Sequence, residues 1–210
     1  MKKYEIIIIQ SSVPIFILIF FISLIYNWTL GFTSFTTYAY VLNSAGSIPR
    51  KAPTLQLIDP AGHQIDINHL LQDRYALINF MYFRCPYVCS TTTAKLIDMY
   101  TQLKNSMPNK LVMISISIDK RHDTRNILHH AWIIYGKPKG WYFVSLISEI
   151  TQELDANLQR FGVWAYMRPD GFFNHSTYLF LLDPNGNIIH VFNIEENNEE
   201  IIKMIHKVIS

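Results

Sequence analysis

The sequence predicts a mixed α/β domain behind an apolar N-terminal segment, and three patterns support that fold class. Two nearly continuous apolar runs, residues 75–83 and 111–118, are typical of buried strands. Residues 90–104 between them show helical spacing of apolar side chains. A strand, helix and strand of this connection length form a parallel pair with a right-handed crossover. Residues 177–182 and 188–192 flank an Asp-Pro-Asn-Gly turn, which indicates an antiparallel hairpin.

The N-terminal segment carries no charged side chain between Glu5 and Arg50. A helix over its apolar part, residues 6–30, would be roughly 37 Å long at about 1.5 Å per residue. That length crosses a hydrocarbon core of about 30 Å. Lys2 and Lys3 precede this helix, so the positive-inside rule places the N-terminus in the cytoplasm.

We therefore expect a single transmembrane helix in the inner (cytoplasmic) membrane, in contact with lipid, and the remaining chain on the periplasmic side. A cleaved signal peptide is the alternative, although the apolar run is long for one and no Ala-x-Ala site follows it. The predicted segments are an anchor at residues 1–30, a juxtamembrane linker at 31–51 and a folded domain at 52–210.

The remaining elements of the domain follow from shorter patterns. Residues 55–59 and 63–67 are predicted strands around a Pro-Ala-Gly turn. Helices are predicted over 127–135, 148–161 and, as an amphipathic C-terminal helix, 199–209. The aromatic residues at 141–143 are interpreted as core and loop packing. A βαβ half joined to an antiparallel hairpin half is the plan of a thioredoxin-like fold.

Charge and cysteine content exclude several classes of function. The net charge is only +2 and the basic residues are dispersed, which argues against a nucleic-acid partner. Two cysteines are too few for a disulfide-stapled scaffold. A zinc ribbon would need a second cysteine pair, and the chain has none.

The two cysteines, Cys85 and Cys89, lie where a buried strand is predicted to end and a helix to begin. A thiol there has a lowered pKa because the positive end of the helix dipole favours the thiolate. Residues four apart on a helix rise about 6 Å and face the same side, a separation that also allows a disulfide, whose Cα atoms lie about 4.4–6.8 Å apart. A redox-active pair and a two-thiolate metal site therefore both remain open.

A third ligand would complete a metal site. Two thiolates and one imidazole suit Cu(I) and can also hold Cu(II). Of the eight histidines, His175 is the best placed, after a glycine-containing loop and just before the strand at 177–182. An ordinary hydrogen-bonded histidine is the alternative for this residue.

Three segments together resemble the Sco/SenC family of copper chaperones. They are residues 83–89, residues 115–124, and His175 followed by the turn at 182–186. The resemblance implies a thioredoxin-like copper-binding domain over residues 52–210, with copper, as Cu(I) or Cu(II), held by Cys85, Cys89 and His175. It further implies a binding protein rather than an enzyme, which delivers copper to the binuclear site of cytochrome c oxidase subunit II and acts on the thiols of its target. Another periplasmic copper chaperone or a thiol reductant would be a further partner.

Asp119 matches the acidic residue that the family has after the second buried strand, which implies a role behind the metal ligands or toward a partner. Helix capping is the alternative for Asp119. The chain departs from the family pattern at Tyr87, Ser90 and Lys120, and none of these positions is a ligand.

Two other readings of the sequence stay open. A thiol–disulfide oxidoreductase or redox sensor would use Cys85 and Cys89 without His175, and a peroxide-reducing relative fits less well. The pair His129 and His130 is interpreted as part of a solvated helix face, and His122 as a surface residue.

Overall fold

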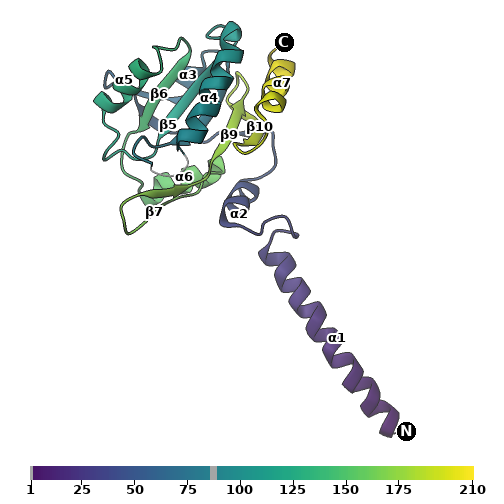
Figure 1. Cartoon of the computed structure of the whole chain (residues 1–210). Coiled ribbons are helices and arrows are strands. Elements are labelled where there is room, and N and C mark those ends of the chain that lie inside the picture. Colours follow the sequence, from purple (N-terminus) through teal and green to yellow (C-terminus); the bar gives the residue numbers. More distant parts are fainter. Residues whose placement is uncertain (1, 86–88) are drawn as a thin grey trace.

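The computed structural model describes the backbone of residues 2–85 and 89–210, and the surroundings of the side chains of residues 13–85 and 91–210. Among these residues, strands and helices alternate over residues 64–161, and successive strands follow one another over residues 165–193 before the C-terminal helix (Figure 1). The helices are α1 (Lys2–Trp28), α2 (Thr37–Ser44), α3 (Ile67–Leu71), α4 (Cys89–Leu103), α5 (Arg125–Ile134), α6 (Gln152–Phe161) and α7 (Asn198–Ile209), with a short 3-10 helix at Lys104–Ser106.

In the described part of the chain, eight strands form one sheet. Their order across it is β1 (Arg50–Lys51), β10 (Asn187–Asn193), β9 (Tyr178–Leu182), β4 (Tyr75–Met81), β5 (Leu111–Ser117), β6 (Trp141–Leu146), β2 (Gln56–Ile58) and β3 (Gln64–Asp66). Strands β4 and β5 are parallel and α4 connects them, as predicted. Strands β9 and β10 form the predicted antiparallel hairpin. Asp183 closes its turn by accepting hydrogen bonds from the backbone amide and the side-chain amide of Asn187.

Trp141 and Phe143 are buried in the core, which agrees with the interpretation of residues 141–143 as core packing, but strand β6 itself was not predicted. It pairs parallel to β5 and is almost entirely buried. A short apolar run buried on both faces carries no alternation, so sequence alone does not distinguish it from packed loop residues.

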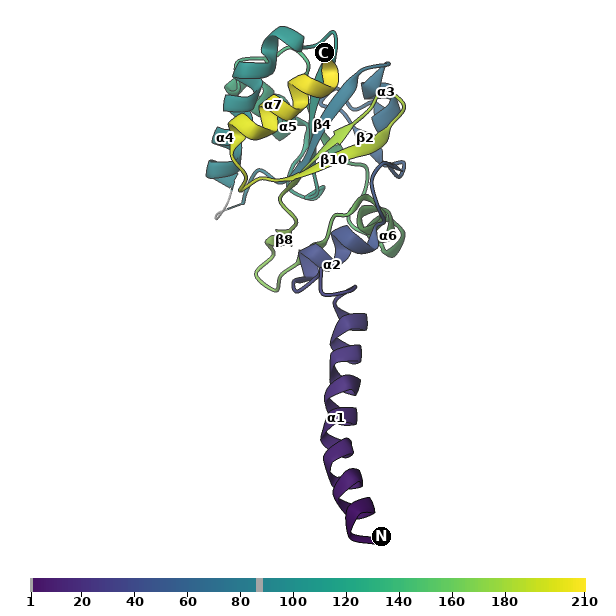
Figure 2. The ribbon, with the colours of Figure 1, turned by 90° about the vertical axis from the view of Figure 1, so that its right-hand side faces the viewer.

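The predicted linker also contains regular structure. Thr36 caps α2 by accepting a hydrogen bond from the Ala39 amide at 3.1 Å. The ring of Tyr38 packs edge-on against Trp164, with 5.3 Å between centroids, and Arg50 donates to the Phe161 carbonyl at 3.0 Å. Helix α2 therefore rests on the end of α6 (Figure 2).

The sheet separates two apolar clusters. Side chains of α4, α5 and α7 fill one cluster, and side chains of α3 and α6 fill the other. Strand β4 serves both, since Leu77 belongs to the first cluster and its neighbour Ile78 to the second. Helices α4 and α7 lie side by side on their face of the sheet (Figure 2).

Two further features complete the fold. Strands β7 (Ala165–Met167) and β8 (Phe173–His175) form a separate two-stranded ribbon, which the sequence patterns did not predict. Helix α1 extends away from the domain (Figures 1 and 2). Within the described residues, no helix combines the length and the apolar character needed to cross a membrane.

Candidate metal centre

Residues 82–89, here called the cysteine segment, follow the carboxyl end of β4. Strand β4 ends at Met81 and α4 begins at Cys89, which confirms the predicted strand-to-helix junction. Cys85 is half-buried and packs against the apolar cluster that includes Tyr82 and Phe173. Residues 86–88 and the side chain of Cys89 lie outside the described residues, and so does the predicted pairing of the two thiols.

His175, the last residue of β8, has one ring nitrogen committed to a hydrogen bond. Its Nδ1 lies 2.9 Å from the Ser176 carbonyl oxygen. A carbonyl only accepts hydrogen bonds, so Nδ1 carries the proton of the neutral ring and Nε2 keeps its lone pair. Burial lowers the pKa of His175, and the smaller effect of the Ser176 hydrogen bond raises it. The imidazole is therefore neutral near pH 7 and has the form of a metal ligand.

The fold places His175 near the N-terminal end of α4. His175 and Thr177 line two adjoining hollows together with Thr92 of α4. Thr92 is three residues after Cys89, about one helical turn along. The prediction that a loop entering the hairpin brings His175 near the cysteine turn therefore agrees with the position of β8.

Tyr82 links the histidine strand to the cysteine segment. Its hydroxyl donates to the Phe173 carbonyl at 2.9 Å, and both groups are buried. Its ring stands edge-on to the His175 ring, with 5.7 Å between centroids. Residue 82 is three positions before Cys85, so this one side chain contacts the strand that ends in His175 and belongs to the segment that carries Cys85.

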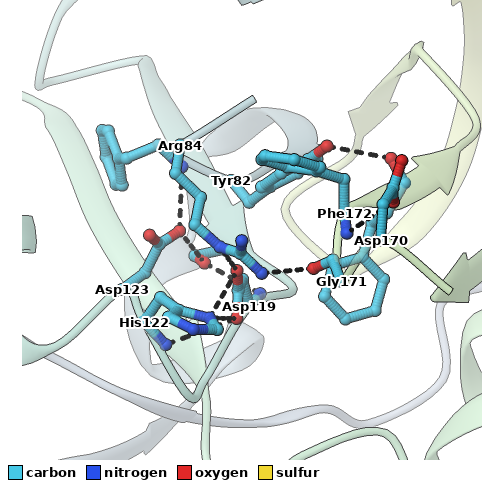
Figure 3. A network of polar contacts seen from close by, with 11 residues as sticks. Tyr82, Arg84, Asp119, His122, Asp123, Asp170, Gly171 and Phe172 are labelled. Carbon is cyan, nitrogen blue, oxygen red and sulfur yellow. Dashed lines mark hydrogen bonds and ion pairs between the residues drawn. The ribbon is translucent and has the colours of Figure 1, made fainter. Parts of the chain in front are cut away.

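Two buried aspartates hold the cysteine segment from the other side (Figure 3). Asp123 accepts hydrogen bonds from the Phe83 amide at 2.9 Å and the Ser117 hydroxyl at 2.5 Å. Burial raises the pKa of Asp123, against the lowering effect of these two hydrogen bonds. Asp119 accepts from Nε of Arg84 at 2.6 Å and is only 2% exposed.

The structure excludes one of the two roles considered for Asp119. Thr124, not Asp119, is the residue at the N-cap of α5, so the helix-capping alternative is wrong.

His122 is exposed, as predicted, but its Nδ1 lies 2.9 Å from Asp119 Oδ1. His129 and His130 are exposed on α5, which agrees with a solvated helix face.

Sequence reasoning missed the roles of Tyr82, Arg84 and Asp123. Two signals bear on them: Arg84 directly precedes Cys85, and two aspartates four residues apart directly follow a buried strand. Among the side chains that the structure describes, no group of three or more His, Cys, Asp or Glu residues is placed to hold a metal ion, and Cys89 is not in that set. Cys85 and His175 supply one soft thiol and one neutral imidazole, donors that suit copper.

Comparison with known proteins gives a consistent family. The family model described as SCO1/SenC matches residues 48–210. A SCO2-like protein of Rickettsia felis is 25% identical over 157 residues, which are 71% of this chain and 73% of that protein.

Solved structures share the fold. Arabidopsis thaliana ScoI with copper bound has a TM-score of 0.62 at 17% identity, and the match covers 75% of this chain and 99% of that one. BsSco, a member of the Sco family of cytochrome c oxidase assembly proteins with an identified disulfide switch, has a TM-score of 0.60 at 20% identity, covering 77% and 95%. The predicted thioredoxin-like α/β fold is confirmed.

Proposed function

This chain belongs to the SCO1/SenC family, and from that premise we propose that it binds copper and delivers it to the binuclear copper site of cytochrome c oxidase subunit II. The observation that carries the proposal is the neutral His175 ring, whose Nδ1 is occupied by Ser176 and whose Nε2 keeps a free lone pair. A histidine that served only as a hydrogen-bonded core residue would not need to lie beside the N-terminal end of α4, where Cys89 is found.

In this proposal Cys85 and Cys89 are thiolate ligands and His175 is the imidazole ligand of the transported ion. Two thiolates hold Cu(I), and the imidazole adds the nitrogen donor that Cu(II) prefers. Burial disfavours a charged imidazole, so the proton competes weakly with copper for His175. The copper-bound state of the Arabidopsis relative supports copper as the ion.

Thiol–disulfide chemistry on the partner is the second part of the proposal. Cys85 and Cys89 would cycle between a disulfide and a dithiol, and only the dithiol would bind copper, because a disulfide sulfur is not a thiolate. The disulfide switch of BsSco supports this cycle. If that cycle were the whole function, the chain would be an oxidoreductase or redox sensor, and His175 would be dispensable.

The membrane placement is also proposed. The chain would be held by a single helix in the inner membrane, with the domain on the periplasmic side. The long uncharged segment and Lys2 and Lys3 support it. So do the exposed apolar side chains of the described part of α1, which include Phe16, Phe20 and Phe21.

Metal competition tests the proposed function. The full chain, in detergent and with its thiols reduced, is equilibrated with copper and zinc together, and bound metal is measured after separation. Copper should be bound in preference to zinc. A double Cys85→Ser, Cys89→Ser variant should lose it, because hydroxyls are poor ligands for Cu(I). Preferential zinc binding, or copper binding that persists in the double variant, would contradict the proposal.

A further inference from the structure

Arg84 connects three segments that meet at the candidate metal centre (Figure 3). It belongs to the cysteine segment, since the next residue is Cys85. Its Nε donates to the buried carboxylate of Asp119 at 2.6 Å. A terminal nitrogen of the same guanidinium donates to the Gly171 carbonyl, and the group lies over the Phe172 ring with 4.9 Å to its centroid.

The ribbon that Arg84 contacts is joined to the sheet by the short connection from β8 to β9 and is packed on the domain by side-chain contacts such as these. Strands β7 and β8 pair with each other and not with the eight-stranded sheet. A two-stranded ribbon has little stability of its own. Within the described residues, Arg84 holds Gly171 and Phe172, and Tyr82 holds the next residue, Phe173. The cysteine segment therefore contacts β8 at Phe173, two residues before His175.

The guanidinium of Arg84 donates to Asp119 and to Gly171 in different directions. It can do so because its N–H groups diverge in one rigid plane, here called the fork. Asp119 fixes Nε from the loop after β5, and His122 contacts the other oxygen of that carboxylate at 2.9 Å. The terminal nitrogen is then directed toward Gly171. A lysine would supply the positive charge for Asp119, but as a single ammonium on a flexible stem it would not hold both partners in this geometry.

We propose that Arg84 is a positioning residue for copper binding: its fork, fixed by Asp119, holds the β7–β8 ribbon on the cysteine segment and so sets His175 relative to Cys85. This inference rests on the proposed function for its copper readout, but not for the holding of the ribbon. It assigns a role to a residue that is not itself a ligand.

The test compares Arg84→Lys and Arg84→Gln with wild type, all as full chains in detergent with circular dichroism to verify folding. Arg84→Lys keeps the charge beside buried Asp119, so it retains a folded protein in which only the fork is lost. Both variants should bind Cu(II) about tenfold more weakly, as expected for loss of one charged hydrogen bond. Their Cu(II) absorption and electron paramagnetic resonance spectra should change, while Cu(I) affinity, carried by the thiols, should change much less.

Hydrogen exchange supplies a readout without metal. In the metal-free variants, amides of residues 171–175 should exchange faster than in wild type. Arg121→Gln is the matched control, because Arg121 is an exposed arginine in the loop after β5 that also carries Asp119, and it should behave as wild type in every measurement.

The outcomes separate this inference from the proposed function. Wild-type Cu(II) spectra and exchange in folded Arg84→Lys would overturn it, because charge alone would then suffice. Unchanged exchange in Arg84→Gln would overturn it as well. If wild type binds no copper while exchange at 171–175 rises in both variants, the holding role stands and the proposed function fails.

Discussion

At the scale of single residues, the hydrogen bond of His175 determines which of its ring nitrogens has a free lone pair. The Ser176 carbonyl selects the tautomer with its proton on Nδ1. Burial lowers the pKa of the ring. Both effects favour a neutral imidazole with a free Nε2, the form that a copper ion requires.

The lowered pKa of His175 predicts a specific pH dependence of stability. In the unfolded chain the ring takes up a proton below its ordinary pKa of 6.5, whereas the folded state resists protonation. The neutral buried ring therefore contributes fully to the unfolding free energy above pH 6.5, and this contribution is lost as the pH falls through the lower pKa of the folded state. In urea unfolding of the metal-free chain, wild type should lose stability below pH 6.5 more steeply than His175→Gln. Equal slopes for the two proteins would show that burial does not perturb His175.

The sequence could mark Cys85, Cys89 and His175 as candidate ligands, whereas the residues that surround this candidate site could not be predicted. The spacing of Cys85 and Cys89 marks them directly, and the ligand role of His175 is what the resemblance to the Sco/SenC family implies. Arg84 pairs with Asp119 across 35 positions, and Tyr82 bonds Phe173 across 91. Such pairs arise from the topology of the sheet, and no local pattern marks them.

At the scale of elements, segments with a long apolar run, a helical period or a clear turn beside them were predicted, and the others were not. Helices α4 and α7 and strands β4, β5 and β9 lie within a few residues of their predicted ranges. Strand β6 was missed because a short apolar run without alternation is not distinguished from packed loop residues. The strands of the β7–β8 ribbon were missed because each is only three residues long, too short to show an alternation.

The ribbon predicts a measurable role for the Tyr82 hydroxyl. Tyr82→Phe keeps the buried ring but leaves the Phe173 carbonyl without this donor, which should cost about 1–3 kcal/mol of unfolding free energy. Urea unfolding measures the loss. Tyr100→Phe is the control, because the Tyr100 hydroxyl makes an exposed, longer bond of 3.3 Å to Lys139, and its loss should be close to neutral. Equal effects of the two changes would contradict the role given to Tyr82.

At the scale of the whole molecule, α1 stands apart from the domain with its described apolar side chains exposed (Figure 1). Phe16 is 70% exposed and Trp28 is 85% exposed. A continuous apolar surface of this kind is stable in water only when something covers it. In our proposal the membrane covers it, and α2, resting on α6, lies between the membrane and the domain.

Reporter fusions test this placement. A C-terminal enzyme that is active only outside the cytoplasm should be active when fused to the full chain and inactive when residues 1–30 are deleted. A C-terminal reporter that is active only in the cytoplasm should give the reverse. Cytoplasmic activity of the full-chain fusion would refute the proposed topology.

The central claim, that His175 is a copper ligand, is tested most directly by an anaerobic Cu(II) titration of the full chain. Wild type and His175→Ala are followed by absorbance and circular dichroism, with His130→Ala, which removes an exposed histidine of α5, as the control. We predict that His175→Ala keeps its fold and its two-cysteine chemistry but loses Cu(II) binding and the thiolate-to-copper charge-transfer band, because Cu(II) needs the nitrogen donor. His130→Ala should match wild type. A folded His175→Ala protein with wild-type Cu(II) affinity and spectrum would contradict the claim and favour a thiol–disulfide oxidoreductase.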